Sequence, residues 1–490
     1  MDLRNFAVGS GWITFGQIAT QVTGVVTSIV VARWLGPEGL GELGITRDIA
    51  VLIVPIATLG ISQMVTRQIG RSINEDNASD EISGLLSSLM WFAAIASILS
   101  STILLLMAMP VERYLDAPGL HELIQLLALV VCISVSYELV NAVTIGLQEF
   151  KALSVRQVLS AILSPVVILT FMYFWGVKGV VLSSGLVNLL LLGFLLKFLI
   201  KGPVNRYQLR FIRPDFLGLI RLVRKSLPLL GSMAMMRPMG LVGSSTLLVY
   251  ASLTDLGLFR VALTFYGFAL MVPSAFQMVL LPMFSRIKEP ELIAQQGVLV
   301  IRLILVLSAP FFVFAVFAAE PVTTLLFGEN YLGAGSLVAL MLLTSFVAMI
   351  AMLMETNLIS QGRTSRQFSI NIVNFIVFVS LSQFLIPHYV QWGLVLTYLG
   401  TAIVALLNYL LVFKKSRDDT GGALYMPVIV SSAVVAIAYG YSASGLSWRY
   451  AGVFIVLAVL VSLSLLSKTD RILLRSMVMS EPRFNSRKVE

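Results

Sequence analysis

Long apolar runs, separated by short polar segments, recur along almost the whole of the chain. A helix needs about 20 apolar residues to cross a hydrocarbon core of about 30 Å, and runs of that length occur about fourteen times here. The pattern therefore predicts an all-α, polytopic membrane protein with about 14 transmembrane helices. The predicted spans are Val8–Val31, Leu43–Met64, Ile82–Ala108, Leu120–Ile145, Leu153–Trp175, Val177–Leu199, Ser226–Tyr250, Leu258–Phe284, Gly297–Ala319, Ala334–Leu358, Phe368–Ile386, Trp392–Phe413, Ala423–Tyr441 and Ala451–Ser467.

Composition agrees with this pattern, because 58% of the 490 residues are hydrophobic and 12% are charged. That balance excludes a soluble globular enzyme. The first apolar run is longer than the core of a signal peptide and lacks a small-residue cleavage pattern, so we expect a retained span. One cysteine and two histidines, Cys132, His121 and His388, are too few for a disulfide or a metal-ligand set. We expect no metal and no cofactor.

Positive charge gives the orientation of the predicted spans. The net charge is +9, and most of the 34 Lys and Arg residues lie on alternate loops and in the two tails, most densely between Lys197 and Lys225. Five lie on the opposite loops: Arg33, Arg113, Lys178, Arg260 and Arg449. Because cytoplasmic loops carry an excess of Lys and Arg, both termini are predicted to be cytoplasmic. We expect a multi-pass protein of the plasma membrane with an even number of spans.

Weak internal repetition divides the chain. Positions about 216 residues apart carry the same residue types in equivalent loops and helix ends: Gly41 with Gly257, Asn141 with Asn357, and Gly146 with Gly362. The repetition predicts two pseudo-symmetric six-helix lobes in parallel orientation, a plan that is typical of secondary transporters. The predicted domains are residues 1–205, residues 206–415, and residues 416–490 with two extra spans and a basic cytoplasmic tail.

Basic residues inside predicted spans are the first candidates for a binding site. An ionisable side chain within a span is costly, so it should face a partner or a water-filled cavity. Four arginines lie within or at the ends of spans and could bind an anionic substrate there: Arg47, Arg237, Arg260 and Arg302. Arg237 is predicted near the midplane. Pairing of Arg47 with Asp48, snorkelling of Arg260 and interfacial anchoring of Arg302 are structural alternatives.

Three carboxylates are candidates for ion coupling: Asp48, Glu138 and Glu355. Glu138 and Glu355 stand eight and seven residues before the matched glycines Gly146 and Gly362. A carboxylate in a partly dry cavity can bind protons in the working pH range. The structural alternative is a helix-end charge near the interface.

Two apparent signals for nucleotides or nucleic acid do not hold. The segment Gly39-Leu-Gly-Glu-Leu-Gly44 fits a dinucleotide fingerprint but follows a membrane helix where a strand is required. No phosphate-binding loop of the Gly-Lys-Ser/Thr type occurs, so ATP hydrolysis is not expected. The basic segment Lys201–Lys225 lies between two spans, where it sets orientation and contacts anionic headgroups rather than nucleic acid.

Three short motifs carry a resemblance to a known family. They are Ala32-Arg-Trp-Leu-Gly-Pro-Glu-Gly-Leu-Gly41, Gly146-Leu-Gln-Glu-Phe-Lys151 and Gln361-Gly-Arg-Thr364. With the twelve-span duplication and two added helices, the chain resembles the polysaccharide-transport and O-antigen-type flippases of the multidrug/oligosaccharidyl-lipid/polysaccharide exporter superfamily. The resemblance covers most of the chain.

This resemblance implies a flippase that moves a polyprenyl-pyrophosphate-linked oligosaccharide outward by alternating access between two lobes. It also implies a cationic central cavity, which Arg47, Arg237 and Arg260 could supply, and a lipid-tail groove formed by the last two helices. The first span departs from the peptidoglycan-precursor flippases: it carries Gln17, Thr20 and Gln21 instead of arginines, which argues against that substrate. Implied partners are membrane lipids, a glycan polymerase and other envelope-assembly proteins.

Two other readings stay open. A cation-coupled multidrug exporter of the same superfamily should carry acidic and aromatic groups in its cavity, whereas the intramembrane charges here are mainly basic. A non-transporting membrane scaffold for glycan-assembly enzymes would use the basic loop and tail. Loss of activity after point changes deep within the lobes would exclude the scaffold.

Overall fold

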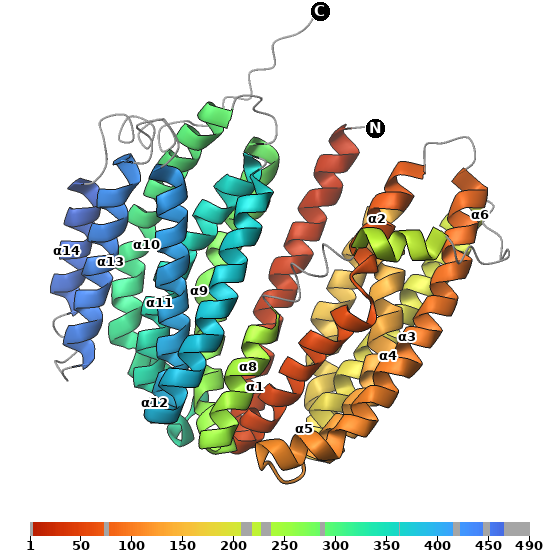
Figure 1. Cartoon of the computed structure of the whole chain (residues 1–490), viewed down its shortest axis with the longest axis horizontal. Helices are drawn as coiled ribbons and strands as arrows, with labels where there is room; N and C mark the ends of the chain where they lie inside the picture. Colours follow the sequence, from red (N-terminus) through yellow and green to blue (C-terminus); the bar gives the residue numbers. More distant parts are fainter. Residues whose placement is uncertain are drawn as a thin grey trace, which may run out of the picture. The chain divides into compact units, whose positions relative to one another are not determined.

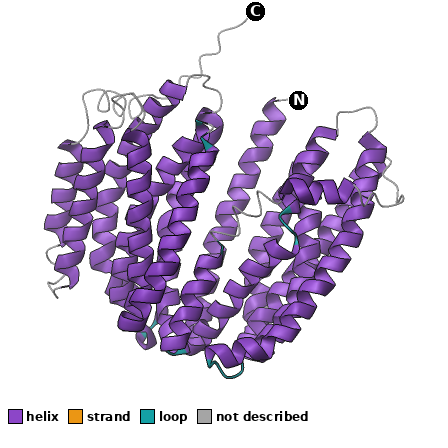
Figure 2. Ribbon diagram, viewed as in Figure 1, coloured by secondary structure: helices purple, strands orange, loops and turns teal. Residues whose placement is uncertain are grey.

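The computed structural model describes residues 3–72, 78–206, 218–226, 237–284, 290–361, 363–414, 422–443 and 451–464. Helices account for nearly all of these residues, and no strand occurs among them (Figure 2). The elements are α1 (Leu3–Ala57), α2 (Ile61–Ser72), α3 (Ala78–Leu115), α4 (Leu120–Gly146), α5 (Phe150–Lys201), α6 (Pro203–Arg206), α8 (Pro238–Tyr250), α9 (Leu253–Phe284), α10 (Pro290–Phe327), the 3-10 turn η1 (Glu329–Tyr331), α11 (Ala334–Ser360), α12 (Thr364–Lys414), α13 (Gly422–Ala443) and α14 (Ala451–Ser464). The predicted all-α membrane fold is confirmed.

Three helices are about twice as long as a bilayer is thick. A helix of 52 residues such as α5 would extend about 78 Å if straight. Each is broken where the sequence predicts a boundary between two spans: α1 at Gly36 (φ 71°), α5 at Gly176 (φ 56°) and α12 at Val390 (φ 53°). Left-handed backbone interrupts the helical hydrogen bonds, and glycine adopts it without a steric penalty.

Within the described residues, seven helices are long and apolar enough to cross a membrane, or eight if the bent pair α1 and α2 is one span. Because α5 and α12 each contain two predicted spans, this number does not contradict fourteen, which stays a prediction. The first half of the predicted span Ser226–Tyr250 and the end of Ala451–Ser467 lie outside the described residues.

The second predicted span, Leu43–Met64, is not one straight helix. It ends at Ala57, and α2 continues after a bend of 46° with positive φ at Leu59 and Gly60. The side chains of α2 divide by face: Ile61, Val65 and Ile69 are fully buried, whereas the basic residues of this helix are exposed. This amphipathic pattern is typical of a helix that lies against the protein rather than across the bilayer.

The chain divides into two compact units. Unit 1 is Met1–Arg260 with Ile386–Gln391, and unit 2 is Val261–Leu385 with Trp392–Glu490. The division falls inside α9, directly after Arg260. The predicted lobe boundaries at residues 205 and 415 stay a prediction, because they rest on internal repetition rather than on contact density.

In unit 1, α5 packs against α1 and α4, and α3 packs against α4 (Figure 1). A small core of Val31, Met172 and Val180 joins the two broken helices α1 and α5 next to their kinks. In unit 2, α10 contacts α11, α13 and α14. The most apolar 18-residue stretch of α11 is 89% buried, against 28% for α3, so α11 is the central helix of its unit.

Candidate functional site

Helices α1 and α9 approach closely at the predicted repeat glycines. A Cβ atom on Gly41 would lie 2.0 Å from the carbonyl oxygen of Leu253, and one on Gly257 would lie 1.8 Å from that of Pro37. No larger residue fits at either position without separating the helices. Two glycines that the sequence matched only as repeat partners therefore meet at one helix contact in unit 1.

One turn further along both helices, Gly44 faces Arg260. A Cβ atom on Gly44 would lie 2.2 Å from Arg260 Nε and 2.9 Å from Cζ. Gly44 and Arg260 are also 216 residues apart, so a second repeat-related pair lies in direct contact. If two copies of a repeat meet at a twofold axis, equivalent positions near the axis contact each other, as Gly44 and Arg260 do. Sequence reasoning did not single out Gly44, although the repeat offset applied to Arg260 leads directly to it.

The start of α9 is set by a reciprocal cap. Ser252 Oγ accepts a hydrogen bond from the Asp255 backbone N–H at 3.2 Å, and Asp255 Oδ2 accepts one from the Ser252 backbone N–H at 3.0 Å. This arrangement is a capping box, which satisfies backbone groups that a helix leaves open at its beginning. Helix α8 starts instead at Pro238, whose fixed φ suits the first helical position. These local signals place Ser244 and Arg260 on adjacent helices.

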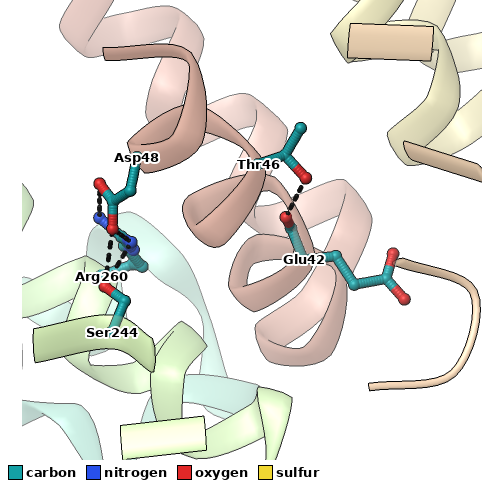
Figure 3. A network of polar contacts seen from close by, with 5 residues as sticks. All are labelled: Glu42, Thr46, Asp48, Ser244 and Arg260. Carbon is teal, nitrogen blue, oxygen red and sulfur yellow. Dashed lines mark hydrogen bonds and ion pairs between the residues drawn. The ribbon is translucent and has the colours of Figure 1, made fainter. Parts of the chain in front are cut away.

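Arg260 binds Asp48 through both ends of its guanidinium fork (Figure 3). Its Nη1 donates to Asp48 Oδ1 at 3.2 Å, and its Nη2 forms an ion pair with Oδ2. Ser244 Oγ accepts from the same Nη2 at 2.8 Å and donates to Asp48 Oδ2 at 2.7 Å. Arg260 is only 9% exposed. The three residues form a charge-balanced network that joins α1, α8 and α9.

Arg47 differs from Arg260. It lies one residue before Asp48 on α1 and is exposed. It interacts electrostatically with Arg260 and Asp48 but makes no hydrogen bond or ion pair with any described residue. Asp48 therefore pairs with Arg260, 212 residues away, rather than with its chain neighbour, and Arg260 is buried.

The opposite side of α1 carries a separate polar group. Thr46 Oγ1 donates to the backbone carbonyl of Glu42 at 2.8 Å, and the Glu42 carboxylate points away from the Asp48–Arg260 pair (Figure 3). The network thus contains one carboxylate, Asp48. Ser244 was missed from the sequence because it stands in a run of small residues, Gly243-Ser-Ser-Thr246, with no charge to mark it.

The other predicted cations lie elsewhere. Arg237 precedes α8 and is exposed, and it makes no hydrogen bond with a described residue through its side chain. Its predicted depth at the midplane stays a prediction, because residues 227–236 lie outside the described part of the chain. Arg302 is half-buried on α10, in unit 2.

The repeat-related acids have different surroundings. Glu138 is exposed, whereas Glu355 is half-buried and accepts a hydrogen bond from Gln367 Nε2 at 2.7 Å. Within the part of the chain that the structure describes, Glu355 is therefore the one of these two acids whose carboxylate is held by a polar neighbour. Among the described residues, no group of three or more His, Cys, Asp or Glu side chains could hold a metal ion.

The matched asparagines have different partners as well. Asn141 Oδ1 accepts a hydrogen bond from Arg156 at 3.0 Å, and Asn357 Oδ1 accepts one from Gln361 at 2.5 Å. Gly146 is a close-packing position, since a Cβ atom there would lie 2.9 Å from Ile69 Cβ. Its repeat partner, Gly362, lies outside the described residues.

Comparison with solved structures defines the fold. The fold is shared with "Lipid II flippase MurJ, inward closed conformation", at a TM-score of 0.72 and 12% identity, covering 95% of this chain and 99% of that one. An inward-facing multidrug resistance MATE family transporter of the MOP superfamily aligns at a TM-score of 0.67 and 16% identity, covering 87% of this chain and 96% of that one. The MATE transporter VcmN of Vibrio cholerae, in the bent form, aligns at 0.54 and 17%, covering 89% and 98%. The molecule has the fold of a polytopic membrane transporter.

The family follows from the sequence match. The profile described as "Polysaccharide biosynthesis protein" matches residues 6–288, more than half of the chain, and the protein belongs to this family. The match includes nearly all of α1 and the whole of α8 and α9, so it contains every member of the Asp48–Ser244–Arg260 network. A search of curated proteins finds no significant match.

Proposed function

We propose that this protein is a flippase that moves a polyprenyl-pyrophosphate-linked oligosaccharide across the plasma membrane by alternating access. The observation that carries the proposal is the pair of neighbouring guanidinium groups in unit 1, Arg260 held by Asp48 and Arg47 exposed beside them. Membership in the polysaccharide biosynthesis family and the MurJ-like fold support it.

The chemistry of the arginines suits a diphosphate. A guanidinium offers a planar fork of donors that matches two oxygens of a phosphoryl group, and it stays charged at any working pH. Arg47 can take one phosphoryl group directly, since no described residue occupies its donors. Arg260 can take the other when its fork exchanges the Asp48 carboxylate for phosphate oxygens. Until then Asp48 keeps Arg260 from being a buried, unpaired cation.

Arg237 and Arg302 are proposed as further cationic contacts. Arg237 stands at the beginning of α8, where the helix dipole also favours an anion. Asp48, Glu138 and Glu355 remain candidates for ion coupling. Of these, Glu355 is favoured because it is half-buried and its carboxylate is held by Gln367.

The first experiment removes the gene from its host and restores it with single variants. Arg47→Gln removes one charge from an exposed side chain, so the protein should still fold and insert. We expect at least a tenfold loss of transport, seen as lipid-linked oligosaccharide accumulating on the cytoplasmic leaflet and polysaccharide lost from the surface. Arg237→Ala should likewise abolish transport while leaving folding intact.

Arg113→Gln is the matched control, because Arg113 is also exposed and lies at the end of α3, outside the network. Normal transport with both Arg47→Gln and Arg237→Ala would contradict the proposed site. Unchanged glycan in the deletion strain, together with new sensitivity to cationic drugs, would indicate the multidrug exporter instead. A glycan defect that no point change deep in the fold reproduces would indicate a scaffold.

A further inference from the structure

The end of α5 contains a groove that plays no part in the proposed transport site. It has a volume of about 370 Å³ and is lined by Phe194, Lys197, Phe198, Lys201 and Gly202. The two phenylalanines are four residues apart, and so are the two lysines. Side chains at this spacing lie one above the other on a helix, so each pair forms a short column along the groove.

The two lysines have no anionic partner in the described structure. Both are exposed, and neither forms a hydrogen bond or an ion pair with a described residue. No carboxylate of the described residues lines the groove. Lys178, in the same half of α5, differs because it forms an ion pair with Glu122. The described lining of the groove therefore carries two positive charges, which an anion would complement.

The surroundings of the groove are apolar. Leu196 and Ile200, which alternate with the lysines, are 41% and 60% exposed. One turn before Lys197, a Cβ atom on Gly193 would have no heavy atom within 4 Å, so the surface there is open. The apolar half-helix that follows Gly176 ends at these lysines. Lysines at the end of an apolar helix place their charges at the headgroup level of a bilayer.

We propose that this groove binds an anionic phospholipid of the leaflet in which α5 ends, the cytoplasmic leaflet by the distribution of basic residues. Lys197 and Lys201 donate to the headgroup phosphate, and Phe194 and Phe198 contact the first part of an acyl chain. The occupant is a membrane lipid rather than a soluble phosphate because the charged and apolar contacts are continuous along one helix face. The site requires only that α5 crosses the bilayer, so it does not depend on the transported substrate.

Native mass spectrometry of the full-length protein in neutral detergent tests this site by titration with phosphatidylglycerol. Phosphatidylcholine and glycerol phosphate serve as parallel probes. We expect preferential binding of phosphatidylglycerol, and Lys197→Gln with Lys201→Gln should weaken it roughly 25-fold, or about fivefold per lysine. Lys197→Arg with Lys201→Arg should keep it.

The matched control, Lys151→Gln with Arg366→Gln, removes the same charge from two exposed positions that do not line the groove. It should bind phosphatidylglycerol as the unaltered protein does. Equal loss in the control, undiminished binding in the Lys197/Lys201 variant, or equal affinity for phosphatidylcholine would each overturn the site. Glycerol phosphate binding as tightly as the lipid would overturn the choice of a lipid as its occupant.

Discussion

Two basic regions of this molecule satisfy their charges in opposite ways. In the Asp48–Ser244–Arg260 network, the cation is buried and an internal carboxylate binds both ends of its fork. At the end of α5, Lys197 and Lys201 are exposed and no described residue neutralises them. A buried cation must carry its own anion because unpaired burial is costly, whereas a cation at the bilayer surface can take its anion from the membrane. The comparison separates a cation that the fold itself neutralises from cations that no described residue neutralises.

The largest expected effect breaks the internal pair. Asp48→Ala leaves Arg260 buried without its carboxylate, and we expect the free energy of unfolding to fall by about 3–5 kcal/mol. Chemical unfolding in detergent measures the change. The double variant Asp48→Leu with Arg260→Met removes both charges and should recover most of the loss. If Asp48→Ala lowers the free energy of unfolding by less than about 0.5 kcal/mol, the Asp48–Arg260 pair does not stabilise the contact between α1 and α9.

A smaller effect tests the close helix contact beneath the network. Gly257→Ala places a Cβ atom 1.8 Å from the Pro37 carbonyl oxygen, so α1 and α9 must separate. We expect a loss of about 1–3 kcal/mol, the usual range for overpacking, visible as a lower Tm. Gly193→Ala, which adds a methyl group in open space, should be neutral or stabilise the helix by about 0.5–1 kcal/mol. Changes of the same sign and size in both variants would argue against the contact.

The smallest effect on folding is expected at the exposed lysines. Lys197→Gln with Lys201→Gln should alter the free energy of unfolding by less than about 0.5 kcal/mol in neutral detergent, since neither lysine has a described partner. Adding phosphatidylglycerol should then raise the Tm of the unaltered protein more than that of the variant, because a bound ligand stabilises the folded state. A large loss of stability without lipid would show that these lysines already serve the fold.

Much of the fold could be predicted because each membrane helix is marked by the hydropathy of its own residues. Apolar length alone separates α3 from α4 and marks the two spans within α5, and the break at Gly176 falls between the predicted ends at Trp175 and Val177. The bend that separates α2 from α1 was missed. The buried residues of α2 are apolar but are separated by polar ones, so the mean hydropathy of the segment does not reveal them.

The candidate site could be predicted only in part from the sequence. Arg47, Arg260 and Asp48 were marked because charges within spans are costly, and this signal belongs to each residue by itself. Which arginine takes the carboxylate was not predictable, since adjacent residues on a helix, such as Arg47 and Asp48, point in different directions. Gly44 contacts Arg260, and Ser244 joins the network, only because three helices meet. A small uncharged residue has no property in the sequence that indicates such a contact.

The amino-acid sequence alone therefore dictates that this chain enters a membrane as helices, roughly where most of the long helices begin and break, and which charges need a partner. These properties follow from solvation and backbone conformation, which act within about 20 residues. The tertiary structure alone decides that Asp48 holds Arg260 and leaves Arg47 exposed. Partner choice depends on distances between segments about 200 residues apart, and those distances exist only once α1, α8 and α9 have packed against one another.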